Sequence, residues 1–195
     1  MAAASQFVLE SSDLFPLLFE PFVNQERITV LDVGPGSPET VNYFSQFRCR
    51  LMFADLYSGL NTQTEPDFED LLAFPEDTRF DICLLWDVLN YMSVDEVVAF
   101  SAHLQPFLHE NSHGHGYGAF SRSKPILVSR YGVATSREVI VRPDVDSTLT
   151  APHPHVQAEI SSLLSCFSLK RRTLLQGGRL EFLLQALVTR TSSDA

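Results

Sequence analysis

The sequence predicts an α/β domain built on a mostly parallel sheet. Residues 30–39 (Val-Leu-Asp-Val-Gly-Pro-Gly-Ser-Pro-Glu) end an apolar strand that begins near Ile28 and lead through a glycine turn into a helix start. A second strand at 51–54 follows and delivers Asp55 at its carboxyl end, about 20 residues beyond the turn. Strand, helix and strand in this order are typical of a parallel βαβ unit. The 195 residues, 45% of them hydrophobic, suit one domain with a full core.

The glycine turn and Asp55 indicate a nucleoside cofactor. Gly34 and Gly36 lack a Cβ, so the backbone there can turn sharply and approach a ligand. Ser37 suits the N-cap and Pro38 the first position of a helix expected to reach about Phe47, whose first N–H groups have no partner within the helix. A carboxylate at the end of the next strand can accept hydrogen bonds from both hydroxyls of a ribose.

The pattern resembles motif I and the second acidic motif of the class I S-adenosylmethionine-dependent methyltransferases. Residues 80–91 resemble that family's fourth strand and the segment after it, with Asn90 and Tyr91 in place of the frequent Glu-His pair. Residues 168–189, around Gln176-Gly177-Gly178, resemble its closing antiparallel hairpin. The resemblance covers most of the chain and implies a Rossmann-like methyltransferase sandwich of seven strands or slightly fewer.

The resemblance also implies S-adenosylmethionine as cofactor and names candidate site residues. Asp32 would order the loop around the methionine end, and Asp67 and Phe68 are the best matches to the adenine motif. The expected cofactor-binding residues are Asp32, Gly34, Pro35, Gly36, Asp55, Leu56, Asp67, Phe68 and Asp87. Methyl transfer requires no nucleophilic residue, so the catalytic candidates are only the strand-end side chains Asp87, Tyr91 and Tyr131. Asn90 could face the methyl group or the acceptor, and Arg130 could attract an acidic acceptor, although a surface salt bridge is the default for Arg130.

Two other functions remain open. The dinucleotide-binding motif G-x-G-x-x-G has a third glycine at the position where this chain has Glu39. This difference disfavours an NAD-dependent oxidoreductase. A non-catalytic methyltransferase-like binding or regulatory module is the stronger alternative, since Asn90 and Tyr91 depart from the family pattern. The segment between Asp55 and Asp81 also departs from it. With only about 25 residues it is too short for a standard crossover, so we expect a third strand or helix that is reduced or missing.

Two further helical segments are predicted, one before the first strand and one after residue 93. Residues 13–23 contain Pro16 and Pro21 and predict a short or broken helix over the first strand. Ser93 and Glu96 form a capping box for a helix that ends near Pro106.

The second half of the chain then contains a loop and two β segments. Residues 111–124, rich in glycine and histidine, predict a loop before a fifth strand at 126–129. The long connection at 130–150 includes a β-rich piece, 138–141, and could cover the pocket as a lid. We expect a single domain over 1–195, with an N-terminal helical segment (1–25) and a core (26–190).

Charge and composition limit the partners. With a formal charge of −10, the chain offers no positively charged surface that would bind a phosphate backbone. The one basic cluster, Lys170 to Arg172, lies in a predicted strand and is expected to form a solvated sheet edge. Three scattered cysteines indicate reduced, mostly buried thiols in a cytoplasmic protein. No apolar run suits a membrane span or signal peptide. The expected partner is a small-molecule acceptor, without nucleic acid or membrane, and the oligomeric state stays open.

A metal site is not expected, although histidines gather in two segments. A stable site needs further ligands in fixed geometry, and no cysteine or H-x-x-x-H helix supplies them. The histidines concerned are His109, His113, His115, His153 and His155.

Overall fold

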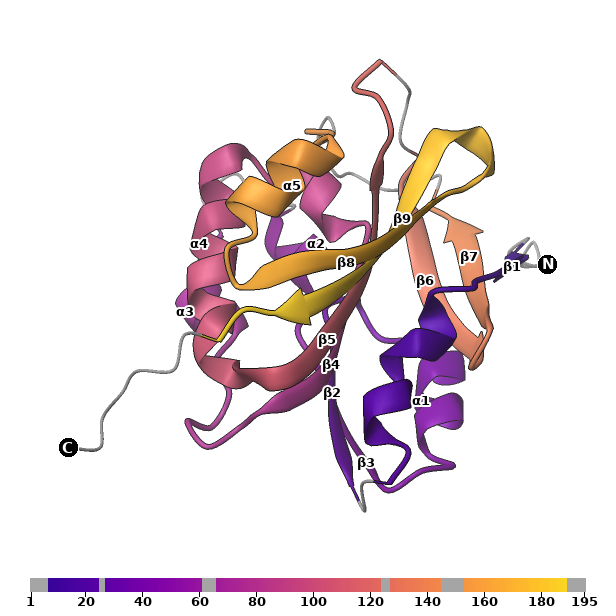
Figure 1. The fold of residues 1–195 in the computed structure, drawn as a ribbon, viewed down its shortest axis with the longest axis vertical. Coiled ribbons are helices and arrows are strands. Elements are labelled where there is room, and N and C mark those ends of the chain that lie inside the picture. Colours follow the sequence, from indigo (N-terminus) through magenta and orange to yellow (C-terminus); the bar gives the residue numbers. More distant parts are fainter. Residues whose placement is uncertain (1–6, 25–26, 61–65, 124–126, 145–152, 189–195) are drawn as a thin grey trace.

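The computed structural model describes residues 7–24, 27–60, 66–123, 127–144 and 153–188, and it contains two sheets (Figure 1). The larger sheet has six strands in the order β3-β2-β4-β5-β9-β8. In that order the strands are β3 (Cys49–Phe53), β2 (Ile28–Asp32), β4 (Phe80–Trp86), β5 (Leu108–Ala119), β9 (Arg179–Ala186) and β8 (Phe167–Leu174). The first four are parallel, and β9 pairs antiparallel with both β5 and β8. The mostly parallel sheet and its closing C-terminal hairpin are therefore as predicted.

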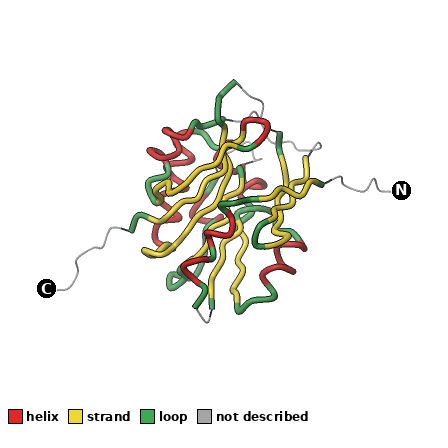
Figure 2. The backbone as a smooth tube through the Cα atoms, turned by 45° about the vertical axis from the view of Figure 1, so that its right-hand side comes forward, coloured by secondary structure: helices red, strands yellow, loops and turns green. Residues whose placement is uncertain are grey.

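The centre of the sheet is the hydrophobic core. All seven residues of β4 are buried, which is the pattern of a parallel strand covered on both faces. The strands cross the middle of the molecule and the helices flank them (Figure 2). The helices α3 (Phe68–Leu71), α4 (Val94–Leu104) and α5 (Gln157–Leu163) gather on one face, and α1 (Pro38–Phe44) lies on the other (Figure 1).

The helix starts follow their sequence signals. Ser37 caps α1 by accepting a hydrogen bond from the Thr40 N–H at 3.1 Å, with Pro38 in the first turn. The capping box of Ser93 and Glu96 is present at the start of α4. Helix α1 ends at Phe44, one turn earlier than expected, and 13–23 forms two 3-10 turns, η1 (Phe15–Leu18) and η2 (Glu20–Phe22).

The crossover between β3 and β4 is reduced, as its length predicted. Its described residues form only two short helices, α2 (Leu56–Leu60) and α3, and residues 61–65 lie outside the described part. Strand β3 is consequently an edge of the six-stranded sheet. At the other edge, Lys170, Arg171 and Arg172 are exposed on β8, as expected for a solvated strand.

The prediction of a loop at 111–124 was wrong, because strand β5 continues to Ala119. The glycines that suggested a loop alternate along this strand and face closely packed side chains. A Cβ on Gly118 would overlap the Phe182 ring and lie 3.0 Å from Ile160 Cδ1. Glycine is therefore required there by packing against a covered sheet face and not by a turn.

Gly118→Ala is expected to lower the free energy of unfolding by about 2 kcal/mol, since the added methyl overpacks a closed interior. Urea unfolding measures the change. Gly114→Ala is the matched control on the same face of β5, because its Cβ would come no nearer than 3.3 Å to Leu184. Equal losses in the two variants would contradict the packing explanation.

The prediction of a fifth strand at 126–129 was also wrong, because the strand that follows β5 belongs to a second, three-stranded sheet. Residues 124–126 lie outside the described part, and β6 begins at Ser129. The sheet has the order β1-β7-β6 and is antiparallel, with β1 (Val8–Ser11), β7 (Glu138–Pro143) and β6 (Ser129–Thr135). The β-rich piece at 138–141 is part of β7, but the pairing of this region with the N-terminus was not foreseen.

The small sheet docks on the start of α1. The Val133 N–H donates to Thr40 Oγ1 at 3.1 Å, and Arg142 pairs with Glu39 at 2.6 Å. A Cβ on Gly132 would lie 2.7 Å from Ser37 Oγ, so the backbone of β6 passes directly over the helix start. The insertion after β5 thus reaches the end of the sheet where the glycine turn lies.

Candidate functional site

The carboxyl ends of β2, β3 and β4 carry the glycine turn, Asp55 and Asp87. Asp32 at the end of β2 pairs with Phe53 of β3 on one side and with Leu84 of β4 on the other. The Leu56 N–H donates to the Val33 carbonyl at 3.1 Å, which ties the two strand-end turns together. Ligands of open α/β sheets bind at this edge. The structure therefore brings these predicted site segments together.

The turn after β2 presents bare backbone to solvent. Pro35 and Gly36 are exposed, and Gly36 has φ of 75°, a conformation that favours glycine. Gly34 is buried, and its N–H donates to Asp32 Oδ1 at 2.8 Å. A Cβ on Gly34 would lie 3.1 Å from Asp32 Oδ1 and 3.3 Å from the Trp86 indole, so a side chain here would have to displace these neighbours.

Asp32 is a buried carboxyl held by Trp86. It is 1% exposed and accepts a hydrogen bond from Trp86 Nε1 at 2.6 Å. Burial raises the pKa of Asp32 to about 6, against the opposing effect of the Trp86 and Gly34 N–H groups. Trp86 itself has φ of 49°, an uncommon value for a bulky residue, at the point where β4 ends.

Asp55 lies at the partly exposed end of β3. Its carboxylate accepts hydrogen bonds from the Ser58 N–H at 3.1 Å and the Ser58 hydroxyl at 2.6 Å, at the start of α2. Leu56, the next residue, is fully buried. Asp55 therefore combines a fixed orientation with access from solvent.

Asp87 lies at the centre of a group of tyrosine hydroxyls. It accepts hydrogen bonds from Tyr57 at 2.5 Å and Tyr91 at 3.3 Å, and its charge also acts on the Tyr131 hydroxyl. Burial raises the pKa of Asp87 to about 6, and these donors reduce that rise. The structure thus brings together the predicted catalytic candidates Asp87, Tyr91 and Tyr131. Tyr131 was expected at the end of the fifth strand of the main sheet, but it lies in β6 of the small sheet.

Tyr57 was not predicted as a site residue. It follows Asp55 by two positions, at the start of α2, and that proximity to a strand end was the available signal. Its pKa is raised well above the ordinary value by burial and by the Asp87 charge, so Tyr57 acts as a neutral donor. Nothing in the residue pattern indicated that the hydroxyl would turn toward β4.

The tyrosine group continues into a network between the two sheets. The rings of Trp86 and Tyr131 stack with centroids 5.3 Å apart and planes 6° apart, and the Tyr117 ring also stacks with Tyr131 at a centroid distance of 5.3 Å. Arg179 lies 5.1 Å over the Tyr117 ring and pairs with Glu10 of β1. Sequence reasoning missed Arg179 and Glu10, because the strands that bring them here lie at opposite ends of the chain.

Other predicted site residues lie apart from this network. Asp67 is exposed and caps α3, whereas Phe68 is buried with its ring 5.9 Å from that of Phe100 on α4. Arg130 pairs with Asp144 at 2.8 Å on the surface.

Asn90 is close to the site, but the nitrogen of its side-chain amide is occupied by the backbone. Its side-chain nitrogen donates to the carbonyl oxygens of Asp87 at 2.9 Å and Tyr117 at 3.0 Å. This position therefore fixes the segment after β4.

The histidines serve separate polar contacts. Within the described residues no three metal-ligating side chains converge. His115 instead pairs with Glu181 at 2.7 Å inside the core, and His109 pairs with Asp81 at 3.1 Å.

The three cysteines are free, with Cys83 and Cys166 buried and Cys49 partly buried. No helix in the described segments is long and apolar enough to span a bilayer.

Comparisons with known proteins bear on the fold. No family model matches the chain, and no curated protein matches its sequence. Among solved structures, the pyocyanin biosynthetic protein PhzM is similar with a TM-score of 0.50 and 15% identity, over 90% of this chain and 55% of that one. A Burkholderia thailandensis 1,6-didemethyltoxoflavin-N1-methyltransferase, with bound 1,6-didemethyltoxoflavin and S-adenosylhomocysteine, has a TM-score of 0.51 and 16% identity, over 90% and 77%.

The mitomycin 7-O-methyltransferase MmcR is similar over 82% of this chain and 49% of that one, with a TM-score of 0.50 and 14% identity. The chain therefore spans about half the length of PhzM and of MmcR. At these identities the likeness concerns the fold. The strand order, the closing hairpin and these matches together show that the chain has the fold of the class I S-adenosylmethionine-dependent methyltransferases, with a shortened crossover between β3 and β4.

Proposed function

We propose that the protein is an S-adenosylmethionine-dependent methyltransferase acting on a small-molecule acceptor. The observation that carries this proposal is the meeting of the exposed Pro35-Gly36 turn, the accessible Asp55 and the buried Asp87 at three neighbouring strand ends. The named activities of two structural neighbours, an N1-methyltransferase and a 7-O-methyltransferase, support it. The strongly acidic composition argues against a nucleic-acid substrate.

The residues present suit the parts of this cofactor. Asp55 would accept the ribose hydroxyls, with Leu56 packing beneath, and the backbone of the glycine turn would bind the amino-acid tail. Asp32 orders that turn through the Gly34 N–H. The Phe68 ring is buried against Phe100, so we assign no adenine contact to it.

Methyl transfer from this cofactor requires no nucleophilic side chain of the protein. Bound S-adenosylmethionine supplies an electrophilic methyl group, so the enzyme must align the acceptor and exclude water. Asp87 and the Tyr57 and Tyr91 hydroxyls would orient an acceptor hydroxyl or amine. A carboxylate with a pKa of about 6 suits the uptake of the acceptor's proton near neutral pH.

A binding or regulatory module without catalysis is the second candidate. It is favoured by the Trp86 indole, which lies against Gly34 and occupies Asp32 with a 2.6 Å hydrogen bond. The reduced crossover after β3 favours it too, because that segment carries the family's adenine contacts.

Titration calorimetry with S-adenosylhomocysteine and with NADH separates these functions. The methyltransferase proposal expects saturable binding of the first compound and none of the second. Failure of S-adenosylhomocysteine to bind at millimolar concentration would favour the module, and binding of NADH instead would favour an oxidoreductase.

Asp55→Ala is expected to weaken S-adenosylhomocysteine binding by about 1.5–3 kcal/mol, because the ribose hydroxyls lose a charged acceptor. Calorimetry at constant salt measures the change. Asp77→Ala is the control and should leave the affinity unchanged, since Asp77 is an exposed carboxylate in the turn before β4, at the opposite end of that strand. Unchanged affinity in the Asp55 variant would show that this acid does not hold the ribose.

A further inference from the structure

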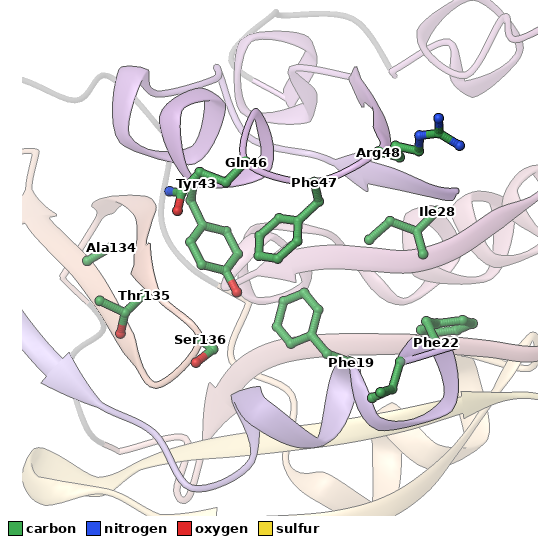
Figure 3. Close-up of a pocket in the computed structure, with 11 residues that line it drawn as sticks. Phe19, Phe22, Ile28, Tyr43, Gln46, Phe47, Arg48, Ala134, Thr135 and Ser136 are labelled. Atoms are coloured by element: carbon green, nitrogen blue, oxygen red, sulfur yellow. The ribbon is translucent and has the colours of Figure 1, made fainter. Parts of the chain in front are cut away.

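A hollow lies at the opposite end of the sheet from the proposed cofactor site. Its volume is about 720 Å³, within the usual range of small-molecule pockets. Ile28 begins β2 and Arg48 immediately precedes β3, so the hollow opens beside the amino ends of these strands. The 3-10 turns η1 and η2, the end of α1 and the β6–β7 connection surround it (Figure 3).

Aromatic rings form one continuous wall of this hollow. The Phe19 and Tyr43 centroids are 6.0 Å apart, and those of Tyr43 and Phe47 are 5.3 Å apart. The three rings face the same space in Figure 3, and Phe22 and Ile28 close its far end. Phe47 is 49% exposed, a large apolar surface at the mouth of a concave site.

The wall also carries hydroxyl groups available to a ligand. The Tyr43 hydroxyl makes no hydrogen bond within the described residues, although the residue is only 8% exposed, and it points into the hollow in Figure 3. The Ser136 hydroxyl on the facing connection also has no partner among the described residues. Burial raises the pKa of Tyr43, so its hydroxyl stays neutral and can donate or accept.

We propose that this hollow is a second binding site, for a neutral and mainly aromatic small molecule with one hydrogen-bonding group. A flat ring would lie against the wall that Phe19, Tyr43 and Phe47 form together, because aromatic rings favour offset or edge contacts with an aromatic partner. The hydrogen-bonding group would meet Tyr43 and Ser136. Among the described residues that line the hollow, Arg48 alone carries a charge, and its exposed guanidinium points away from the aromatic rings in Figure 3, which argues for an uncharged ligand. The site is independent of the cofactor proposal.

Fluorescence titration with N-phenyl-1-naphthylamine, a neutral aromatic amine, tests the site. We expect saturable binding of one probe per chain, unaffected by S-adenosylhomocysteine. Phe47→Ser should weaken it about tenfold, because a large part of the stacking surface is lost. Phe120→Ser is the matched control, since Phe120 is 57% exposed at the far end of β5, and it should leave the affinity unchanged.

Two further variants sharpen the test. Ala134→Trp should abolish probe binding by filling the hollow, and Tyr43→Phe should weaken it about threefold through loss of one neutral hydrogen bond. Circular dichroism confirms that each variant is folded. Non-saturable binding, or equal loss in the Phe47 and Phe120 variants, would overturn the proposal. It would also be overturned if sedimentation showed a dimer that Phe47→Ser dissociates, because this face would then join two copies of the chain.

Discussion

Trp86→Ala is expected to lower the free energy of unfolding by about 4 kcal/mol. The indole is 1% exposed, stacks on Tyr131 and lies against the backbone of Gly34. Its removal leaves a cavity between the two sheets. It also leaves the buried Asp32 without the Nε1 donor at 2.6 Å, and a buried acceptor without its partner adds a desolvation cost.

Trp86→Phe separates the two contributions. Phenylalanine keeps most of the ring and its stacking on Tyr131 but has no N–H, so the expected loss is about 1–2 kcal/mol. Because Trp86 is the one tryptophan of the chain, unfolding must be followed by circular dichroism instead of tryptophan fluorescence. A loss below about 1 kcal/mol for the alanine variant would mean that the indole is not a packing element of the core.

Asp87→Asn is expected to stabilise the protein at neutral pH relative to the unmodified chain. The pKa of Asp87 is raised from 3.8 to about 6 by burial, so the folded state favours the protonated carboxyl. Its contribution to stability is therefore full below pH 3.8 and falls as the pH rises through about 6. With each pKa unit worth about 1.4 kcal/mol, the native chain loses about 3 kcal/mol that the neutral amide keeps.

Urea unfolding of both proteins between about pH 4 and pH 7 measures this difference. The gap should widen in favour of Asp87→Asn as the pH rises. Asp77→Asn is the control, because Asp77 is exposed in the turn before β4, and its effect should stay within about 0.5 kcal/mol. A constant gap between Asp87→Asn and the native chain would show that the carboxyl titrates as it does in the unfolded chain.

Local signals predicted the elements around the site well. The Ser37-Pro38 cap, the Ser93-Glu96 box and the hairpin around Gly177 each depend on neighbouring residues, and each is present. The short crossover before β4 followed from length alone, since a helix, a strand and their connections do not fit into so few residues.

The failed predictions concern residues whose role depends on distant partners. Gly114 and Gly118 resemble loop residues until Leu184 and Phe182 are placed against them. Tyr131 was expected after the fifth strand of the main sheet, yet it lies in β6, which pairs with β7. No local pattern predicts which segments pair across more than a hundred residues, as β1 and β7 do.

The sequence by itself determined the class of the fold and the strand-end positions of Asp32, Asp55 and Asp87, because strand periodicity, glycine turns and helix caps act over a few residues. The tertiary structure alone decided that Tyr57, Tyr91 and Tyr131 converge on Asp87, and that Trp86 lies on the glycine turn. The physical reason is that these contacts join four separate segments, and their burial and hydrogen bonding arise only when both sheets pack together.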